Sequence, residues 1–204
     1  MSRFYKGRFL SEGRLGIFPG AFNPPTLAHL AVAAAARDQY RLDQVVFLLP
    51  TEFPHKPYTG ASFEDRIAML QDAAGNEPAF AIASSGRGLF IDIAREFRAG
   101  CGSGTELFFL CGKDAAERIV NWDYGSGPSF NEQLNEYRLL VASRRGEYEV
   151  PPQYRDKILP IDLPLSWDDC SASQVREAIA QGGDWRRWVP ETVAQRIEQR
   201  KLYK

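Results

Sequence analysis

The chain has 204 residues, of which 44% are hydrophobic and 25% charged, and this ordinary composition excludes a collagen, a coiled coil and a disordered chain. Its 25 Lys and Arg residues balance 26 Asp and Glu residues, which gives a net charge of −1 and argues against a nucleic-acid partner. No apolar run approaches the ~18 residues of a membrane span, so no membrane partner is expected, and three cysteines without CxxC spacing predict free thiols in a reducing cytoplasm.

Strand and helix signals alternate along the chain, which predicts an α/β fold, a doubly wound parallel sheet with helices on both faces. The last fifty residues lean helical and predict a small helical C-terminal region. No repeat or linker interrupts the pattern, so we expect a single domain over residues 1–204. The expected strands are 14–18, 44–49, 80–84, 106–111, 137–142 and 158–161. The expected helices are 26–40, 63–74, 90–98, 115–120, 172–181 and 190–201.

The first candidate functional segment follows the first expected strand, where open α/β sheets bind their ligands. Gly20 would allow a tight turn, and Pro24 or Pro25 would suit the first turn of the next helix. The N-terminus of that helix offers N–H groups and a positive dipole end to a phosphate. Thr26 and His29 are three residues apart and share its face. The segment therefore predicts a phosphate site, and a histidine that only packs or caps is the alternative.

A second candidate segment begins at Ser171. Ser171 followed by Gln174 resembles a capping box and predicts a helix start, where Ser173 and Arg176 share the face of the first turn. Hydroxyls, backbone N–H groups and a guanidinium together can clamp a phosphate, because the arginine fork fits its oxygens. This segment on its own supports an ordinary capped helix with a solvated arginine equally well.

The two segments together resemble the (H/T)xGH and SSTxxR-like motifs of the nucleotidylyltransferase superfamily. More closely, the chain resembles the nicotinate-nucleotide adenylyltransferase family over roughly residues 14 to 203. Each motif alone is a weak signal for this family, but five motifs in the family's order are a strong one. The additional matching segments are Pro54-His55-Lys56, Gly112-Lys113-Asp114 with Trp122, Val141–Gly146, and the tail Val189–Val193 with Leu202-Tyr203.

The resemblance implies a Rossmann-like nucleotidylyltransferase fold and adenylyl transfer from ATP to nicotinate mononucleotide. This reaction gives deamido-NAD and pyrophosphate in NAD biosynthesis. The family forms no covalent enzyme intermediate, and Mg²⁺ bound with ATP is the expected cofactor, without a dedicated protein metal site. The partners would be ATP and a small phosphorylated acceptor.

By motif position, the resemblance assigns three sets of site residues. The catalytic residues would be His29, Thr26, Lys56 and Arg176. The ATP-binding residues would be Gly20, Ala21, Phe22, Thr26, His29, Gly112, Asp114, Ser171, Ser173 and Arg176. The acceptor-binding residues would be Asn23, Lys56, Trp122 and Arg144.

The chain departs from the family pattern at three motif positions. Thr26 stands where this family usually has histidine, Ala28 replaces the glycine of HxGH, and Ala172 replaces one hydroxyl. The Ala28 methyl is expected close to the nucleotide, so glycine at position 28 should raise nucleotide affinity. Residues 123–135 look longer than the corresponding family segment, which would alter the acceptor side.

Two other functions stay open at this point. The acceptor could be nicotinamide mononucleotide, phosphopantetheine or another phosphorylated molecule. Alternatively, the chain could be a nucleotide-binding sensor or scaffold with little catalysis. The sequence leaves the oligomeric state open, a homo-oligomer included.

Overall fold

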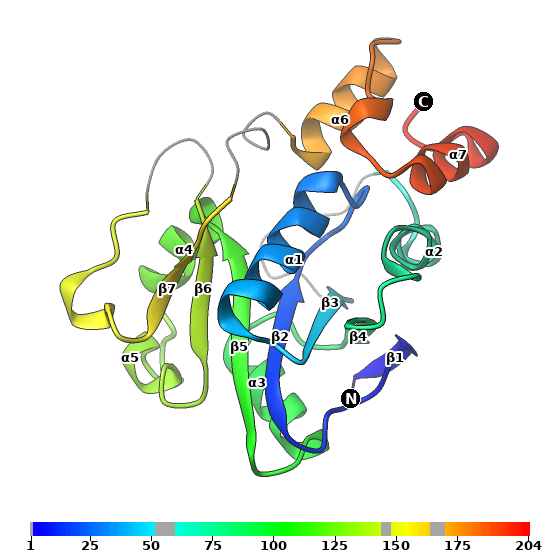
Figure 1. Ribbon diagram of the computed structural model, residues 1–204. Coiled ribbons are helices and arrows are strands. Elements are labelled where there is room, and N and C mark those ends of the chain that lie inside the picture. Colours follow the sequence, from blue (N-terminus) through cyan, green and yellow to red (C-terminus); the bar gives the residue numbers. More distant parts are fainter. Residues whose placement is uncertain (1, 52–59, 144–147, 164–169) are drawn as a thin grey trace.

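The computed structural model describes residues 2–51, 60–143, 148–163 and 170–204. Within them, one sheet has the strand order β1-β4-β3-β2-β5-β6-β7, in which every pairing except that of β1 with β4 is parallel. Figure 1 shows the strands side by side. Their bounds are β1 Arg3–Lys6, β2 Gly13–Pro19, β3 Gln44–Pro50, β4 Phe80–Ser85, β5 Thr105–Gly112, β6 Arg138–Ala142 and β7 Ile158–Ile161.

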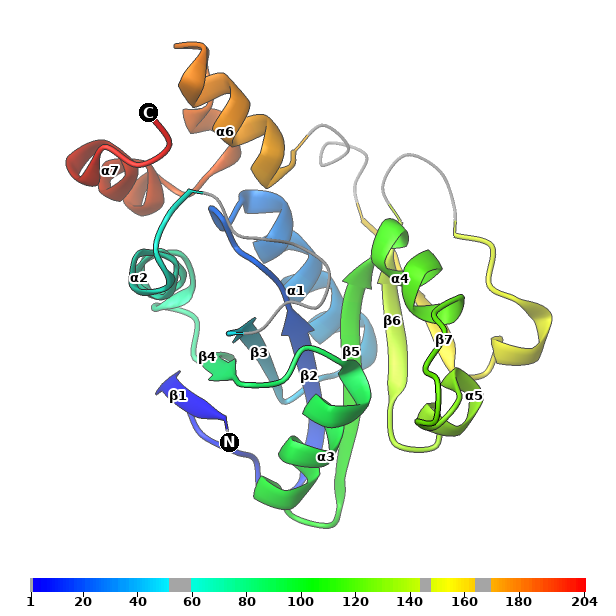
Figure 2. The same ribbon diagram turned by 180° about the vertical axis from the view of Figure 1, so that it is seen from behind.

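The helices cover both faces of the sheet, as the two opposite views show (Figures 1 and 2). Apolar residues of α1 and α2 belong to the core of one face, and those of α3, α4 and α5 to the core of the other. The bounds of these helices are α1 Leu27–Tyr40, α2 Phe63–Ala74, α3 Phe90–Gly100, α4 Lys113–Val120 and α5 Phe130–Gln133. The expected doubly wound α/β fold is therefore confirmed.

The order of the strands creates a reversal point at β2. From β2 the chain proceeds to β3 and β4 on one side, and then returns to place β5 on the other side. All seven residues of β3 are buried, as expected for an apolar strand between two parallel neighbours. In such a sheet the ligand crevice lies beyond the carboxyl ends of the strands at the reversal point, here between β2 and β5.

The C-terminal helices α6 (Ala172–Ala180) and α7 (Glu191–Arg200) form a third apolar cluster with α2. Its buried members include Met69, Val175 and Val193. The Arg196 guanidinium adds an ion pair to Asp72 of α2, with one N–O distance of 3.1 Å. This packing fixes the expected helical C-terminal region beside the start of α1.

The sequence did not predict β1 or α5. The residues of β1 are RFYK, and such a short segment with charged ends becomes a strand only because it pairs with the edge of β4. The 3₁₀ turn η1 (Pro152–Tyr154) was also missed. The sequence predicts a turn packed by tryptophans at residues 185–188, and the 3₁₀ turn η3 (Arg186–Trp188) lies there. Pro24 and Pro25 precede the N-cap residue Thr26, so they do not open the helix as expected.

Candidate active site

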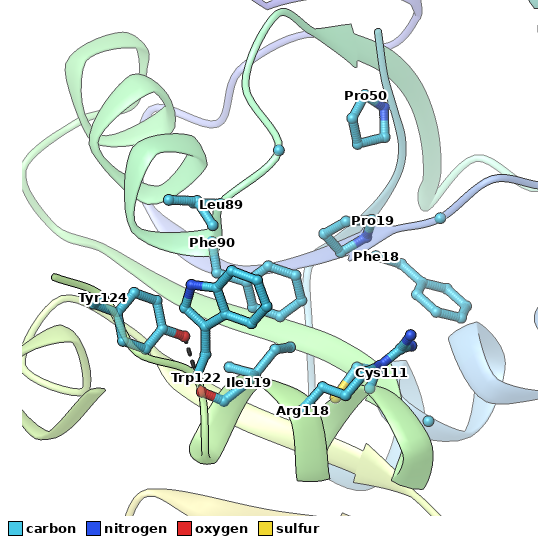
Figure 3. A pocket seen from close by; sticks show the side chains of 14 residues that line it. Phe18, Pro19, Pro50, Leu89, Phe90, Cys111, Arg118, Ile119, Trp122 and Tyr124 are labelled. Carbon is cyan, nitrogen blue, oxygen red and sulfur yellow. Dashed lines mark hydrogen bonds between the residues drawn. The ribbon is translucent and has the colours of Figure 1, made fainter. Parts of the chain in front are cut away.

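A pocket of about 290 Å³ lies at the carboxyl ends of β2, β3 and β5 (Figure 3). This volume is close to the lower end of the range of small-molecule sites. The strand ends contribute Pro19, Pro50 and Gly112, and α4 with the residues after it contributes Arg118 and Trp122. The remaining described lining residues are Phe18, Gly20, Gly88, Leu89, Phe90, Cys111, Ala115, Ile119 and Tyr124.

The turn after β2 is shaped by the aromatic ring of Phe22. This side chain is 1% exposed, and its ring contacts those of Phe18 and Phe47 at centroid distances of 5.6 and 5.5 Å. A Cβ at Gly20 would lie 2.8 Å from the Phe22 ring, and the positive φ of the turn (45°) belongs to Phe22. Gly20 is therefore required for close approach of this ring, which differs from the expected tight-turn role. Because the Phe22 side chain is buried, the predicted contact of this residue with ATP is limited to its backbone.

His29 and Thr26 form a reciprocal capping box at the N-terminus of α1. The Thr26 backbone N–H donates to Nδ1 of His29 at 3.0 Å, and the Thr26 hydroxyl accepts from the His29 backbone N–H at 3.4 Å. The same hydroxyl lies 2.8 Å from Nδ1. A ring nitrogen that accepts carries no proton, so the proton of the neutral imidazole is on Nε2. Thr26 is fully buried and orients the His29 ring through these contacts.

Arg176 of α6 joins the second candidate segment to the first. Its Nη1 donates to the Asn23 carbonyl at 2.7 Å, and its Nη2 donates to the Ser173 hydroxyl at 3.3 Å. Ser171 is the N-cap of α6 and accepts from the Gln174 N–H at 3.2 Å. The structure thus brings the N-terminal turns of α1 and α6 together, although they are far apart in the sequence.

Two residues that support this turn were not among the predicted site residues. The Tyr203 hydroxyl donates to Oδ1 of Asn23 at 2.7 Å, and Arg66 of α2 donates through Nη1 to the Ala21 carbonyl at 3.3 Å. Asn23 Oδ1 also accepts from the Ala61 N–H at 3.3 Å. The sequence signal for Tyr203 was its place in the tail segment that resembles the family, and that segment does not reveal its spatial neighbour.

Replacing Tyr203 by phenylalanine is expected to lower the free energy of unfolding by about 1 kcal/mol, because a buried acceptor on Asn23 loses a donor. Burial raises the pKa of the Tyr203 hydroxyl above its ordinary value, so it stays a donor at neutral pH. Urea unfolding would measure the loss. The matched control is Tyr154→Phe, since the Tyr154 hydroxyl bonds to no other described residue. Equal stability of the two variants would contradict the prediction.

The predicted site residues that follow β5 take different positions relative to the pocket. Gly112 is the N-cap of α4 and lines the pocket, while Asp114 lies exposed in the first turn of α4. Trp122 follows α4 and is 43% exposed, and its indole lines the same pocket as the Phe90 ring (Figure 3). Burial raises the pKa of the Cys111 thiol in the pocket wall to about 12, which keeps it neutral. Lys56 and Arg144 lie outside the described residues.

Ala28 lies on the buried side of α1 and is 1% exposed. The Ala28 methyl group is therefore shielded from solvent, and also from a nucleotide that would take the place of that solvent. This differs from the expectation that the methyl group lies against the ligand. Ala28→Gly should leave the Kd for ATP unchanged within about twofold and lower the free energy of unfolding by about 1 kcal/mol. Calorimetry and thermal unfolding would measure both, with Ala31→Gly as a control for helix propensity. A fivefold tighter Kd would restore the original expectation.

Three further observations concern disulfide bonds, metal ions and membrane spans in the described residues. Cys101, Cys111 and Cys170 form no disulfide bond, as expected. No described group of three or more His, Cys, Asp or Glu side chains is arranged to hold a metal ion. None of the described helices combines the length and apolar character needed to cross a bilayer.

Comparisons with known proteins agree on one family. The family model described as cytidylyltransferase-like matches residues 17–178. The chain is 32% identical over 198 residues to a Thermus thermophilus protein named "Probable nicotinate-nucleotide adenylyltransferase", which covers 94% of this chain and 100% of that protein. A Gloeobacter violaceus protein of the same name is 32% identical over 203 residues, covering 93% of this chain and 96% of its own.

The fold is similar to a solved structure of Plasmodium falciparum nicotinic acid mononucleotide adenylyltransferase complexed with NaAD. The TM-score is 0.72 at 16% identity, and the match covers 94% of this chain and 98% of that one. A second structure of the Plasmodium protein, complexed with APC, matches with a TM-score of 0.70 at 16% identity and the same shares of the two chains. At this identity, the likeness supports the α/β fold.

Proposed function

The chain belongs to the cytidylyltransferase-like family and, within it, to the nicotinate-nucleotide adenylyltransferases, and on this premise we propose that it transfers the adenylyl group of ATP to nicotinate mononucleotide. The products are deamido-NAD and pyrophosphate, in a reaction of NAD biosynthesis. The observation that carries this function is the hydrogen bond from Arg176 of α6 to the Asn23 carbonyl. It connects the start of α6 to the turn after β2 that leads into α1 and His29.

The reaction requires positioning and charge stabilisation more than acid–base catalysis. An oxygen of the acceptor phosphate attacks the α-phosphorus of ATP, and the bond from that phosphorus to the oxygen of the β-phosphate breaks. The attacking phosphate is already an anion, so no protein base has to remove a proton. Negative charge grows on the α-phosphate oxygens and on the departing pyrophosphate.

His29 and Arg176 are suited to these two charges. The Thr26 N–H holds Nδ1 as an acceptor, so Nε2–H is the donor that His29 directs to an α-phosphate oxygen. The Arg176 guanidinium is oriented by Asn23 and Ser173 and receives the pyrophosphate. The N-termini of α1 and α6 add backbone N–H groups and positive dipole ends.

The remaining predicted residues take supporting roles in this proposal. Ser171 and Ser173 begin α6 and contribute N–H and hydroxyl donors to the phosphates. Gly112 and Asp114 contact the adenosine, and Trp122 stacks on the ring of the acceptor. Lys56 and Arg144 remain proposals from motif position alone, as phosphate and acceptor contacts.

We also propose that Mg²⁺ enters with ATP. The donors at the site are a histidine and an arginine, which suit phosphate oxygens, and none of the described carboxylates forms a metal cage. These residues fit a cation held by phosphates and water. When bound, the ion supplies positive charge to the phosphate oxygens. Three cysteines that form no disulfide bond favour a reducing compartment, the cytoplasm, as the place of this reaction.

Pyrophosphate release from ATP and Mg²⁺ would test the proposed function. We expect release that depends on nicotinate mononucleotide and that yields deamido-NAD in equal amount by chromatography. Parallel reactions with nicotinamide mononucleotide and with phosphopantetheine test other acceptors. Absence of release with nicotinate mononucleotide, from a chain that still binds ATP, would refute this acceptor and favour a nucleotide sensor or another substrate.

A further inference from the structure

The pocket at the carboxyl ends of β2, β3 and β5 has one charged side chain among its described lining residues. The family motifs do not account for it. Arg118 lies in the last turn of α4 and lines the pocket. All the other described lining residues are uncharged, and most are apolar or aromatic, such as Leu89, Phe90 and Trp122. The hydroxyl of Tyr124, a further polar group, already donates to the Ile119 carbonyl at 2.9 Å.

The contacts of Arg118 leave its charge uncompensated by described residues. Its Nε donates to the Asp114 carbonyl at 3.1 Å, which anchors the guanidinium to its own helix. Among the described residues, no carboxylate oxygen lies within 4.0 Å of an Arg118 side-chain nitrogen, and the Asp114 carbonyl is the only hydrogen-bond acceptor of the Arg118 side chain. An anchored guanidinium of this kind is suited to receive an anionic group through its outer nitrogens.

Arg118 is close along the chain to an aromatic residue that lines the same pocket. Arg118 and Trp122 are four residues apart along α4 and the residue that follows its C-cap, and both line the same pocket. Figure 3 shows both side chains projecting from this segment, and Phe90 lines the same pocket. A flat ring bound in this pocket could therefore turn a substituent toward the guanidinium.

We propose that Arg118 is a specificity-determining residue, which binds the ring carboxylate of the acceptor and selects the acid over the corresponding amide. This inference rests on the proposed function, because it assigns one group of that acceptor to one residue. The carboxylate of nicotinate mononucleotide matches the planar fork of arginine. The carboxamide of nicotinamide mononucleotide is neutral and gains no ion pair there. Both molecules carry the same phosphate, so phosphate recognition cannot distinguish them.

The test compares Arg118→Gln with the wild-type chain on both acceptors. We expect kcat/KM for nicotinate mononucleotide to fall by about 10-fold, while kcat/KM for nicotinamide mononucleotide changes by less than about twofold. Because Arg118 is exposed, the variant should fold, which circular dichroism would check. The matched control is Glu117→Gln, an exposed neighbour on α4 that does not line the described pocket and should preserve the preference.

Equal losses with both acceptors would overturn the proposal and indicate a phosphate or structural role. An unchanged ratio would also overturn it. Calorimetric Kd values of the two mononucleotides, measured for the wild type and the variant, separate this result from the proposed function. If the wild type binds the acid more tightly and Arg118→Gln abolishes that preference, the proposal stands even where no pyrophosphate is released. If the wild type binds both equally, the proposal fails independently of the catalytic result.

Discussion

Replacing His29 by alanine is expected to lower kcat by roughly 10²-fold or more at saturating ATP and acceptor. In the proposed mechanism the Nε2–H donor meets charge that develops on the α-phosphate in the transition state, so its loss should affect turnover more than substrate binding. Initial rates of pyrophosphate release would give kcat and both KM values. Near-normal turnover in His29→Ala would remove this residue from the catalytic set.

A second substitution separates catalysis from helix capping at the same position. His29→Ala also removes half of the capping box on α1, which costs helix stability. In His29→Asn, the amide oxygen can still accept from the Thr26 N–H, but no donor remains at the Nε2 position. We therefore expect His29→Asn to be more stable than His29→Ala in thermal unfolding and comparably slow. Recovery of kcat by asparagine would show that the loss came from the helix start.

Replacing Arg176 by alanine is expected to lower kcat/KM for ATP by roughly 10²- to 10³-fold. The substitution removes the cation that, in the proposed mechanism, receives the departing pyrophosphate. It also releases the Asn23 carbonyl, which accepts from Arg176 at 2.7 Å. Lysine should restore little, because one ammonium cannot reproduce a fork oriented by two oxygens. Steady-state kinetics with varied ATP would measure the effect, together with product inhibition by pyrophosphate, which should weaken in both variants.

Arg187→Ala provides a matched control for Arg176→Ala. Arg187 has the same side chain in the C-terminal region, and its closest described carboxylate oxygen, on Asp184, is 4.0 Å away at an exposed site. We expect Arg187→Ala to retain wild-type kinetics, since exposed pairs contribute little to stability. If Arg176→Ala unfolds at the same urea concentration as Arg187→Ala and retains full kcat/KM for ATP, its assignment to the pyrophosphate is wrong.

Local sequence patterns determined most of the secondary structure. The helix expected at 63–74 is α2 with Ser62 as its N-cap, and the strand expected at 158–161 is β7. These elements were predictable because a cap, a periodic apolar face and an apolar run are encoded within a few neighbouring residues. The motifs also identified His29 and Arg176 as a pair, although only their resemblance to a family connected them.

The tertiary structure decided how these elements become a site. Arg176 reaches the carbonyl of Asn23 across 153 residues, and Tyr203 reaches its side chain across 180. Packing directs the Ala28 methyl inward, makes Gly20 necessary for the Phe22 ring, and turns the residues of β1 into an edge strand. Local periodicity carries no record of such contacts, because they depend on which surfaces meet when the sheet and its helices pack. The sequence by itself therefore determined the elements and the chemical groups, and long-range packing determined their orientation and their partners.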